Sequence, residues 1–201
     1  MKTLTVLGST GSIGRNTLDV VRRNRHRYEV YGLVAGENVE LLAEQILEFR
    51  PKVAVVATSG AFDRLLERLG LTGLPKSDWP ELGWTDRARV EAASATDVNT
   101  VISAIVGVAG LEATYEAIVR GKRIGLANKE VLVSGGRLVM EAVRKYGAEL
   151  LPVDSEHNGA HQCLRAGNRA AVARLILTAS GGPFRNTPRE ALGFVTPEQA
   201  L

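Results

Sequence analysis

Short apolar runs alternate with longer amphipathic stretches along most of this sequence. The apolar runs are rich in β-branched residues and bounded by glycine or proline, as expected for strands buried on both faces of a sheet. These runs predict strands at residues 4–7, 30–35, 53–57, 101–106, 123–127, 149–153 and 175–178. Helical periodicity fills the segments between them, mainly at residues 17–21, 40–49, 62–69, 111–119 and 138–146. This order predicts βαβ units and an α/β fold with a doubly wound parallel sheet of the Rossmann type.

Two segments depart from this alternation. Residues 71–84 are rich in Gly, Pro and Trp, and we expect an irregular loop there. After Val153 the pattern changes in character. We therefore expect one domain over residues 1–153 and the start of a second, α+β domain over residues 154–201.

Two Thr-Pro pairs near the end of the sequence are typical of helix starts. Thr187-Pro188 and Thr196-Pro197 each put Thr at the N-cap and Pro at the first helical position. The second helix would run for only about one turn before Leu201, and a helix that short is not stable alone. We therefore expect the sequence to be the front part of a longer protein.

The composition is that of a globular protein, with 45% hydrophobic residues, 23% charged residues and a net charge of +3. Basic residues are scattered except at residues 22–27, which we interpret as the solvated end of a helix, and only 5% of residues are aromatic. No apolar run approaches the ~18 residues of a membrane span. Cys163 is the only cysteine, which excludes an internal disulfide and favours a reducing compartment. We expect a cytoplasmic protein that binds neither nucleic acid nor membrane.

A glycine-rich loop follows the first predicted strand and precedes a helical pattern. Its sequence is Gly-Ser-Thr-Gly-Ser-Ile-Gly over residues 8–14. Glycines let the backbone turn tightly and approach a pyrophosphate, which the N–H groups at the helix start would bind. Gly14 would also permit close packing of the helix on the strand. The loop therefore predicts a dinucleotide site rather than an ordinary turn.

The loop after the second predicted strand contains Gly36, Glu37 and Asn38. In dinucleotide-binding folds this loop meets the adenosine ribose, and an acidic residue there favours the free 2′-hydroxyl of NAD. Glu37 is the candidate for that role. Asn38 is suited to cap the helix that begins at Val39, and such a cap is compatible with a cofactor contact.

Two carboxylates, Asp154 and Glu156, directly follow another predicted strand. Ligands bind outside the carboxyl ends of strands in open α/β sheets, and paired carboxylates suit Mg²⁺ or Mn²⁺. Alternatively, Asp154 or Ser155 only caps the helix that follows. His157 and His161 would share one helix face, but the residue after the first histidine is not the Glu that a zinc-protease motif requires.

Two further polar stretches follow predicted strands. Lys129, between Asn128 and Glu130, can hold an anionic or carbonyl oxygen, or can simply open a solvated helix. Ser180 precedes two glycines in a turn whose N–H and hydroxyl groups can bind phosphate, or which is only a tight turn. Together with the glycine loop and the carboxylates, these stretches would lie at the same edge of the predicted sheet.

Five stretches together resemble the 1-deoxy-D-xylulose 5-phosphate reductoisomerase family. They are LGSTGSIG at residues 7–14, LVAGENV at 33–39, LANKE at 126–130, PVDSEHN at 152–158 and LTASGGPFR at 177–185. The resemblance implies rearrangement of 1-deoxy-D-xylulose 5-phosphate, and reduction of the resulting aldehyde by NADPH to 2-C-methyl-D-erythritol 4-phosphate, in non-mevalonate isoprenoid biosynthesis. Mg²⁺ or Mn²⁺ would act as a Lewis acid on the oxygens of this sugar phosphate. A full-length member would be a homodimer.

The resemblance also implies roles for individual residues. Asp154 and Glu156 match metal ligands, and Lys129 and Glu156 match catalytic positions. Substrate-binding positions are matched by Lys129, Ser155, Glu156 and Ser180. Cofactor-contacting positions are matched by Thr10, Gly11, Ser12, Ile13, Gly36, Glu37, Asn38, Asn128 and Glu130. Residues 1–153 would then be the NADPH-binding domain, and residues 154–201 the beginning of the catalytic or connective domain.

The sequence departs from the family in two respects. The family often has a basic residue, which favours the 2′-phosphate of NADPH, where this chain has Glu37. We still expect NADPH, with Ser9 or the backbone serving the phosphate. The family's mobile flap, its phosphate-binding segment with the third metal-ligand glutamate, and its C-terminal helical domain are absent from residues 1–201. We therefore expect little or no turnover by these residues alone.

Two other interpretations explain part of the pattern. A different NAD(P)-dependent oxidoreductase, of the semialdehyde or homoserine dehydrogenase type, would explain the glycine loop but not the carboxylate and SGGPF stretches together. A short-chain dehydrogenase would need Tyr-x-x-x-Lys, which the sequence lacks. A non-catalytic dinucleotide-binding remnant, or one half of a split protein, would bind NADPH without turnover.

Overall fold

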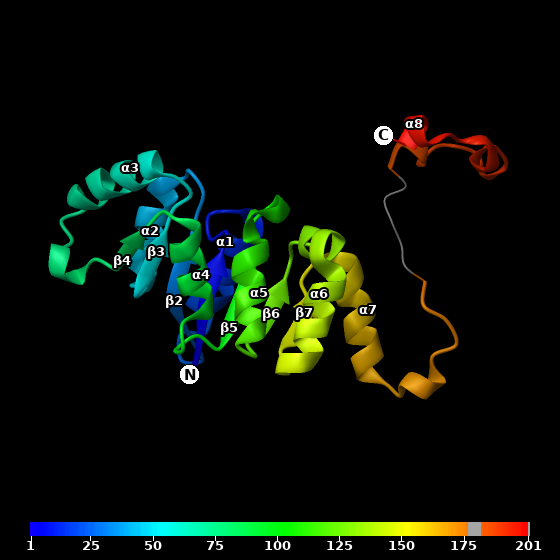
Figure 1. The fold of residues 1–201 in the computed structure, drawn as a ribbon, viewed down its shortest axis with the longest axis horizontal. Helices are drawn as coiled ribbons and strands as arrows, with labels where there is room; N and C mark the ends of the chain where they lie inside the picture. The colour runs from blue at the N-terminus through cyan, green and yellow to red at the C-terminus, as the bar shows by residue number, and fades with distance from the viewer. Residues whose placement is uncertain (177–181, 201) are drawn as a thin grey trace. The chain divides into compact units, whose positions relative to one another are not determined.

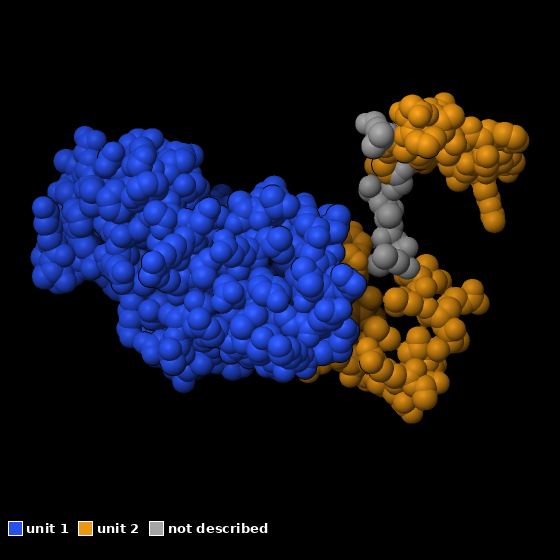
Figure 2. All heavy atoms as spheres, in the orientation of Figure 1, with its two compact units in different colours: residues 1–153 blue, residues 154–201 orange. Residues whose placement is uncertain are grey.

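The computed structural model describes residues 1–176 and 182–200. Its contacts divide the chain into unit 1, residues 1–153, and unit 2, residues 154–201 (Figure 2). No helix in the described part of the chain has both the length and the apolar character that crossing a membrane requires.

Unit 1 is built on one sheet of seven parallel strands in the order β4-β3-β2-β1-β5-β6-β7 (Figure 1). The strands are β1 Lys2–Leu7, β2 Tyr28–Val34, β3 Val53–Val55, β4 Glu81–Gly83, β5 Thr100–Ser103, β6 Arg123–Leu126 and β7 Glu149–Pro152. The strand order reverses between β1 and β5, which is the switch point where such sheets bind ligands. The predicted Rossmann-type doubly wound sheet is therefore confirmed.

Three helices cover each face of the sheet. They are α1 Ser12–Arg23, α2 Val39–Phe49, α3 Ser59–Gly70, α4 Asp86–Ser94, α5 Leu111–Val119 and α6 Glu130–Tyr146. The first three share one hydrophobic core, and the last three share the other. Because side chains alternate along a strand, Leu4 and Val6 of β1 enter the first core while Leu7 enters the second. Both faces of β1 are thereby buried, and the loop that follows it is held firmly.

The structure corrects some predicted boundaries in unit 1. Residues 71–84 are not all loop, because they contain a short 3₁₀ helix, Lys76–Asp78, and the edge strand β4. Helix α4 was not predicted, since it buries mainly small side chains such as Ala92 and Ala93 and so lacks a clear apolar period. Helix α6 begins well before the predicted residue 138.

Unit 2 contains α7 Ser155–Ala166 and α8 Pro197–Ala200, with short 3₁₀ helices between them. None of its described helices has a buried side chain. The Thr196-Pro197 helix start is confirmed, and the backbone N–H of Thr196 donates to Gln199 at 2.9 Å. The Thr187-Pro188 start leads instead to a 3₁₀ helix, Arg189–Phe194.

The strand predicted at residues 175–178 is wrong for the residues that the structure describes. Leu175 and Ile176 have no strand conformation, and residues 177 and 178 lie outside the described ranges. Leu175 is 60% exposed and Ile176 is 74% exposed. A strand is stabilised by pairing with a neighbour, and no strand of the described sheet pairs with this segment.

Candidate functional site: the carboxyl edge of the sheet

The glycine loop connects β1 to α1 by a path that only glycine permits. Gly8 has φ +89°, and a β-carbon there would lie 2.5 Å from the backbone oxygen of Ala104. A β-carbon on Gly14 would lie 2.6 Å from Ser9 Cα. The two glycines therefore let the loop pack tightly between β5 and the first turn of α1.

The start of α1 is open to an anion. Gly11 is its N-cap and provides no side-chain cap, and the first turn of α1 contains no acidic residue. Uncapped N–H groups at a helix start, together with the positive end of the helix dipole, bind phosphate. Thr10 and Ile13 are half-buried beside this turn, and Ser12 is exposed. The loop thus has the shape and charge that a pyrophosphate requires.

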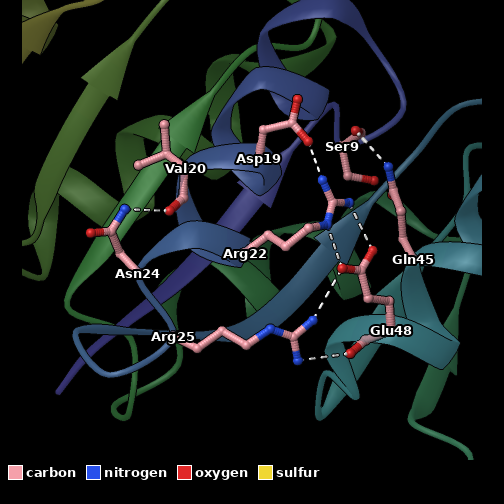
Figure 3. Close-up of polar contacts among 8 residues, drawn as sticks. All are labelled: Ser9, Asp19, Val20, Arg22, Asn24, Arg25, Gln45 and Glu48. Atoms are coloured by element: carbon pink, nitrogen blue, oxygen red, sulfur yellow. Dashed lines mark hydrogen bonds and ion pairs between the residues drawn. The ribbon is translucent and has the colours of Figure 1, made fainter.

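Polar contacts connect α2 to the glycine loop and to the far end of α1 (Figure 3). The side-chain amide of Gln45 donates to the backbone oxygen of Ser9 at 3.0 Å, and both residues are buried. At the other end of α1, Arg22 and Arg25 both pair with Glu48 of α2. The Arg22 guanidinium holds the pKa of Glu48 below its ordinary value. These contacts hold α2 against the glycine loop and against the end of α1.

The loop after β2 places Glu37 between two other elements. Its carboxylate accepts from Thr58 Oγ1 at 2.9 Å and lies 2.6 Å from the guanidinium of Arg64 on α3. Arg64 is the main cause of a lowered pKa at Glu37, and the Thr58 hydroxyl adds to it. Gly36 is exposed, and a β-carbon there would touch nothing within 4 Å. Asn38 caps α2, as predicted, by accepting from Leu41 N at 3.1 Å.

Asn128 joins two loops at the same edge. Its side-chain amide donates to the backbone oxygens of Ile105 and Gly107, the second at 2.7 Å, and its oxygen accepts from Glu130 N at 3.1 Å. The residue is only 4% exposed. The Asn128 side chain therefore acts as a brace between the loop after β5 and the start of α6. Lys129, by contrast, is exposed at that start.

The two carboxylates of unit 2 lie at the start of α7. Asp154 is the N-cap, and its Oδ1 accepts from His157 N at 3.0 Å and lies 2.7 Å from the His157 ring. Partial burial raises the pKa of Asp154, but the hydrogen bonds from His157 outweigh it and hold the pKa below its ordinary value. Ser155 and Glu156 are exposed in the first turn. Asp154 thus does cap the helix, and both carboxylates remain suited to a hard divalent cation.

The predicted Ser180 contact and the predicted metal site are each incomplete in the described residues. Ser180 lies outside the described residues. Within residues 1–176 and 182–200, no group of three or more His, Cys, Asp or Glu side chains is arranged to hold a metal ion. Asp154 and Glu156 would therefore supply only part of a metal site from this range.

Sequence reasoning missed the partners of Glu37 and the loop after β5. Thr58 and Arg64 belong to the next βα unit, so nothing local in the sequence linked them to Glu37. The loop after β5 carried a usable signal, because it contains Gly107, which has φ +75° and begins a short 3₁₀ helix, Gly107–Gly110. Two glycines just after a predicted strand, Gly107 and Gly110, could have marked it as a further loop at this edge.

Comparison with known proteins identifies the family. Residues 4–136 match the model for 1-deoxy-D-xylulose 5-phosphate reductoisomerase, and residues 150–201 match the model for its C-terminal domain. The chain is 77% identical over 201 residues to the 1-deoxy-D-xylulose 5-phosphate reductoisomerase of Solibacter usitatus, covering 100% of this chain and 51% of that protein. Identity to the protein of the same name from Prosthecochloris aestuarii is 49%, with the same coverage.

Solved structures agree with these matches. The reductoisomerase of Zymomonas mobilis in complex with NADPH superposes with a TM-score of 0.83 and 47% identity, covering 99% of this chain and 51% of that one. A DOX-P reductoisomerase in complex with magnesium gives a TM-score of 0.83 and 37% identity, covering 100% and 51%. The chain spans about half the length of the curated relatives it matches. It belongs to the 1-deoxy-D-xylulose 5-phosphate reductoisomerase family.

Proposed function

We propose that the protein converts 1-deoxy-D-xylulose 5-phosphate to 2-C-methyl-D-erythritol 4-phosphate, using NADPH and Mg²⁺ or Mn²⁺, in isoprenoid precursor biosynthesis. This proposal rests on the functional residues that follow the carboxyl ends of three strands. In a chain of this family, a dinucleotide loop follows β1, an exposed lysine follows β6, and two carboxylates follow β7. Relatives solved with NADPH and with magnesium support both cofactors.

In this proposal unit 1 is the NADPH-binding domain and residues 154–201 begin the catalytic domain. The uncapped start of α1, at Thr10, Gly11, Ser12 and Ile13, binds the pyrophosphate through backbone N–H groups. Gly36, Glu37 and Asn38 meet the adenosine ribose. The Asn128 brace keeps the loop after β5 and Glu130 in place beside the cofactor.

The reacting part of the substrate is held by residues that follow β6 and β7. Asp154 and Glu156 hold the divalent cation, which when bound acts as a Lewis acid on substrate oxygens. Lys129 is exposed and charged, and it neutralises a substrate oxygen that gains negative charge. Ser155 and Ser180 bind the substrate by hydrogen bonds. The remaining ligands and phosphate contacts come from outside the described residues.

Two properties of the whole protein belong to the same proposal. We expect a homodimer in solution, which light scattering of the full-length protein would test. A cytoplasmic location is supported by the single cysteine, Cys163, which is exposed and unpaired.

The test is a turnover assay with the full-length protein. NADPH oxidation should depend on both 1-deoxy-D-xylulose 5-phosphate and Mg²⁺ or Mn²⁺, and it should stop when the metal is chelated. Tight NADPH binding with no oxidation under these conditions would contradict the proposal and would instead favour a non-catalytic dinucleotide-binding module.

A further inference from the structure

Glu37 presents a conflict between the local sequence and the proposed cofactor. An acidic residue after the second strand of a dinucleotide-binding fold accepts from the ribose 2′-hydroxyl, and it repels a 2′-phosphate. Ser9 does not resolve the conflict, because this residue of the glycine loop is fully buried, its hydroxyl included. A cationic group that offsets the charge of Glu37 and binds the 2′-phosphate must therefore come from elsewhere.

Arg64 is placed to supply that group. It projects from α3, the helix that follows β3, and its guanidinium lies 2.6 Å from Glu37 Oε2 and 3.4 Å from the Glu37 backbone oxygen. A guanidinium offers a planar set of donors that matches phosphate oxygens in pairs. Its present partner is an anion in the same loop that meets the adenosine ribose.

The environment of this ion pair suits an exchange of anions. The side chains of Arg64 and Glu37 are 52% and 58% exposed, so the pair is worth little in solvent and separates readily. Thr58 adds a hydroxyl donor at 2.9 Å from the same carboxylate. Gly36 leaves open space beside the loop, where a β-carbon would touch nothing within 4 Å.

We propose, on the basis of the function proposed above, that Arg64 and Thr58 bind the 2′-phosphate of NADPH. Glu37 pairs with both side chains until the phosphate displaces it. The Glu37 carboxylate stands in for the phosphate in the free protein. Displacing Glu37 from Arg64 costs binding free energy. The cofactor preference therefore reflects a competition between the Glu37 carboxylate and the 2′-phosphate for one guanidinium. This assigns the choice between NADPH and NADH to α3 rather than to the loop after β2 alone.

The first test compares Arg64→Gln with a matched control, Arg68→Gln. Arg68 lies one turn further along α3, and its Nε is 2.5 Å from Glu40 of α2, so each substitution removes one ion pair made by α3. Dissociation constants for NADPH and NADH are measured by fluorescence on the full-length protein. Arg64→Gln should weaken NADPH binding about tenfold, while NADH binding changes by less than about twofold. Arg68→Gln should change neither.

Equal losses for both cofactors in Arg64→Gln, or an equal effect of Arg68→Gln, would overturn the inference, since either result indicates a structural or general electrostatic role. The proposed function fails in a distinguishable way: the wild-type protein would bind neither dinucleotide, or would bind NADPH without turnover.

The second test removes the competing anion. Glu37→Gln should tighten NADPH binding about threefold at low salt, because Arg64 no longer has an internal partner. The gain should disappear in the Glu37→Gln, Arg64→Gln double variant. A Glu37→Gln protein with unchanged or weaker NADPH binding would refute the displacement.

Discussion

Gly14 lies so close to Gly8 that a β-carbon on Gly14 would overlap the Gly8 backbone oxygen. The atom that the β-carbon would overlap belongs to the backbone, so no side chain can move to relieve the overlap. Gly14→Ala should therefore destabilise the protein by about 1–3 kcal/mol and abolish tight NADPH binding. Urea unfolding and NADPH fluorescence measure the two effects.

The matched control for that variant is Gly11→Ala. Gly11 has φ −75°, which suits alanine, and its nearest contact to a β-carbon would be 3.4 Å. Its unfolding free energy should stay within about 0.5 kcal/mol of the wild type. Equal stability of Gly14→Ala and Gly11→Ala would show that the loop is not packed as described.

Asn128→Ala should cost about 1–3 kcal/mol, because two backbone oxygens in the loop after β5 lose a buried donor. NADPH binding should weaken as well, since that loop packs against Gly8. The comparison is Asn24→Ala, which removes one exposed bond to Val20 O at 2.8 Å (Figure 3). If Asn128→Ala were no less stable than Asn24→Ala, the role as a brace would be wrong.

Much of unit 1 could be predicted because its strands are apolar on both faces and its turns are marked by glycine. The parts that were missed are stabilised by tertiary contacts. Strand β4 has only three residues and is defined by its pairing with β3. The first half of α6 contains Ser134, Gly135 and Gly136, which lower helix propensity, yet Gly135 packs beside Leu111.

In the candidate site, too, local features were predictable and features set by tertiary contacts were not. Loops next to strand ends were predictable, because the fold itself brings them to one edge. The Arg64–Glu37 pair joins residues 27 positions apart, and nothing in either local sequence indicates it. The buried bonds of Asn128 were equally hidden, so it was predicted as a cofactor contact without its role as a brace.

Lys122 gives a prediction for pH dependence. Lys122 is 7% exposed, and its amine donates to the backbone oxygens of Ala95 and Val98 at 2.6 and 2.5 Å. Burial, and then the charge of Arg120, lower its pKa below the ordinary value of 10.5, although Asp97 opposes this. Between the lowered pKa and 10.5 the unfolded chain holds the proton and the folded chain does not. The free energy of unfolding therefore increases with rising pH in that window.

The measurement is the difference in unfolding free energy between wild type and Lys122→Met, taken by urea unfolding at several alkaline pH values. Other titrating groups are common to both proteins and cancel. The difference should shift in favour of the wild type as pH rises toward 10.5. A flat difference, or one that shifts toward Lys122→Met, would contradict a lowered pKa.

Asp154→Asn and Glu156→Gln, made in the full-length protein, test the metal assignment. Asparagine is as good an N-cap as aspartate, so Asp154→Asn keeps the cap of α7 while it removes the negative charge that a divalent cation requires. Each variant should lower metal-dependent turnover by at least about a hundredfold, and NADPH affinity should stay within about twofold.

His161→Gln is the control, because it lies on the same helix and has no assigned role. It should leave turnover and metal dependence unchanged. Full activity in either carboxylate variant would remove that residue from the metal site, and a parallel loss of NADPH binding would point to misfolding of unit 1 instead.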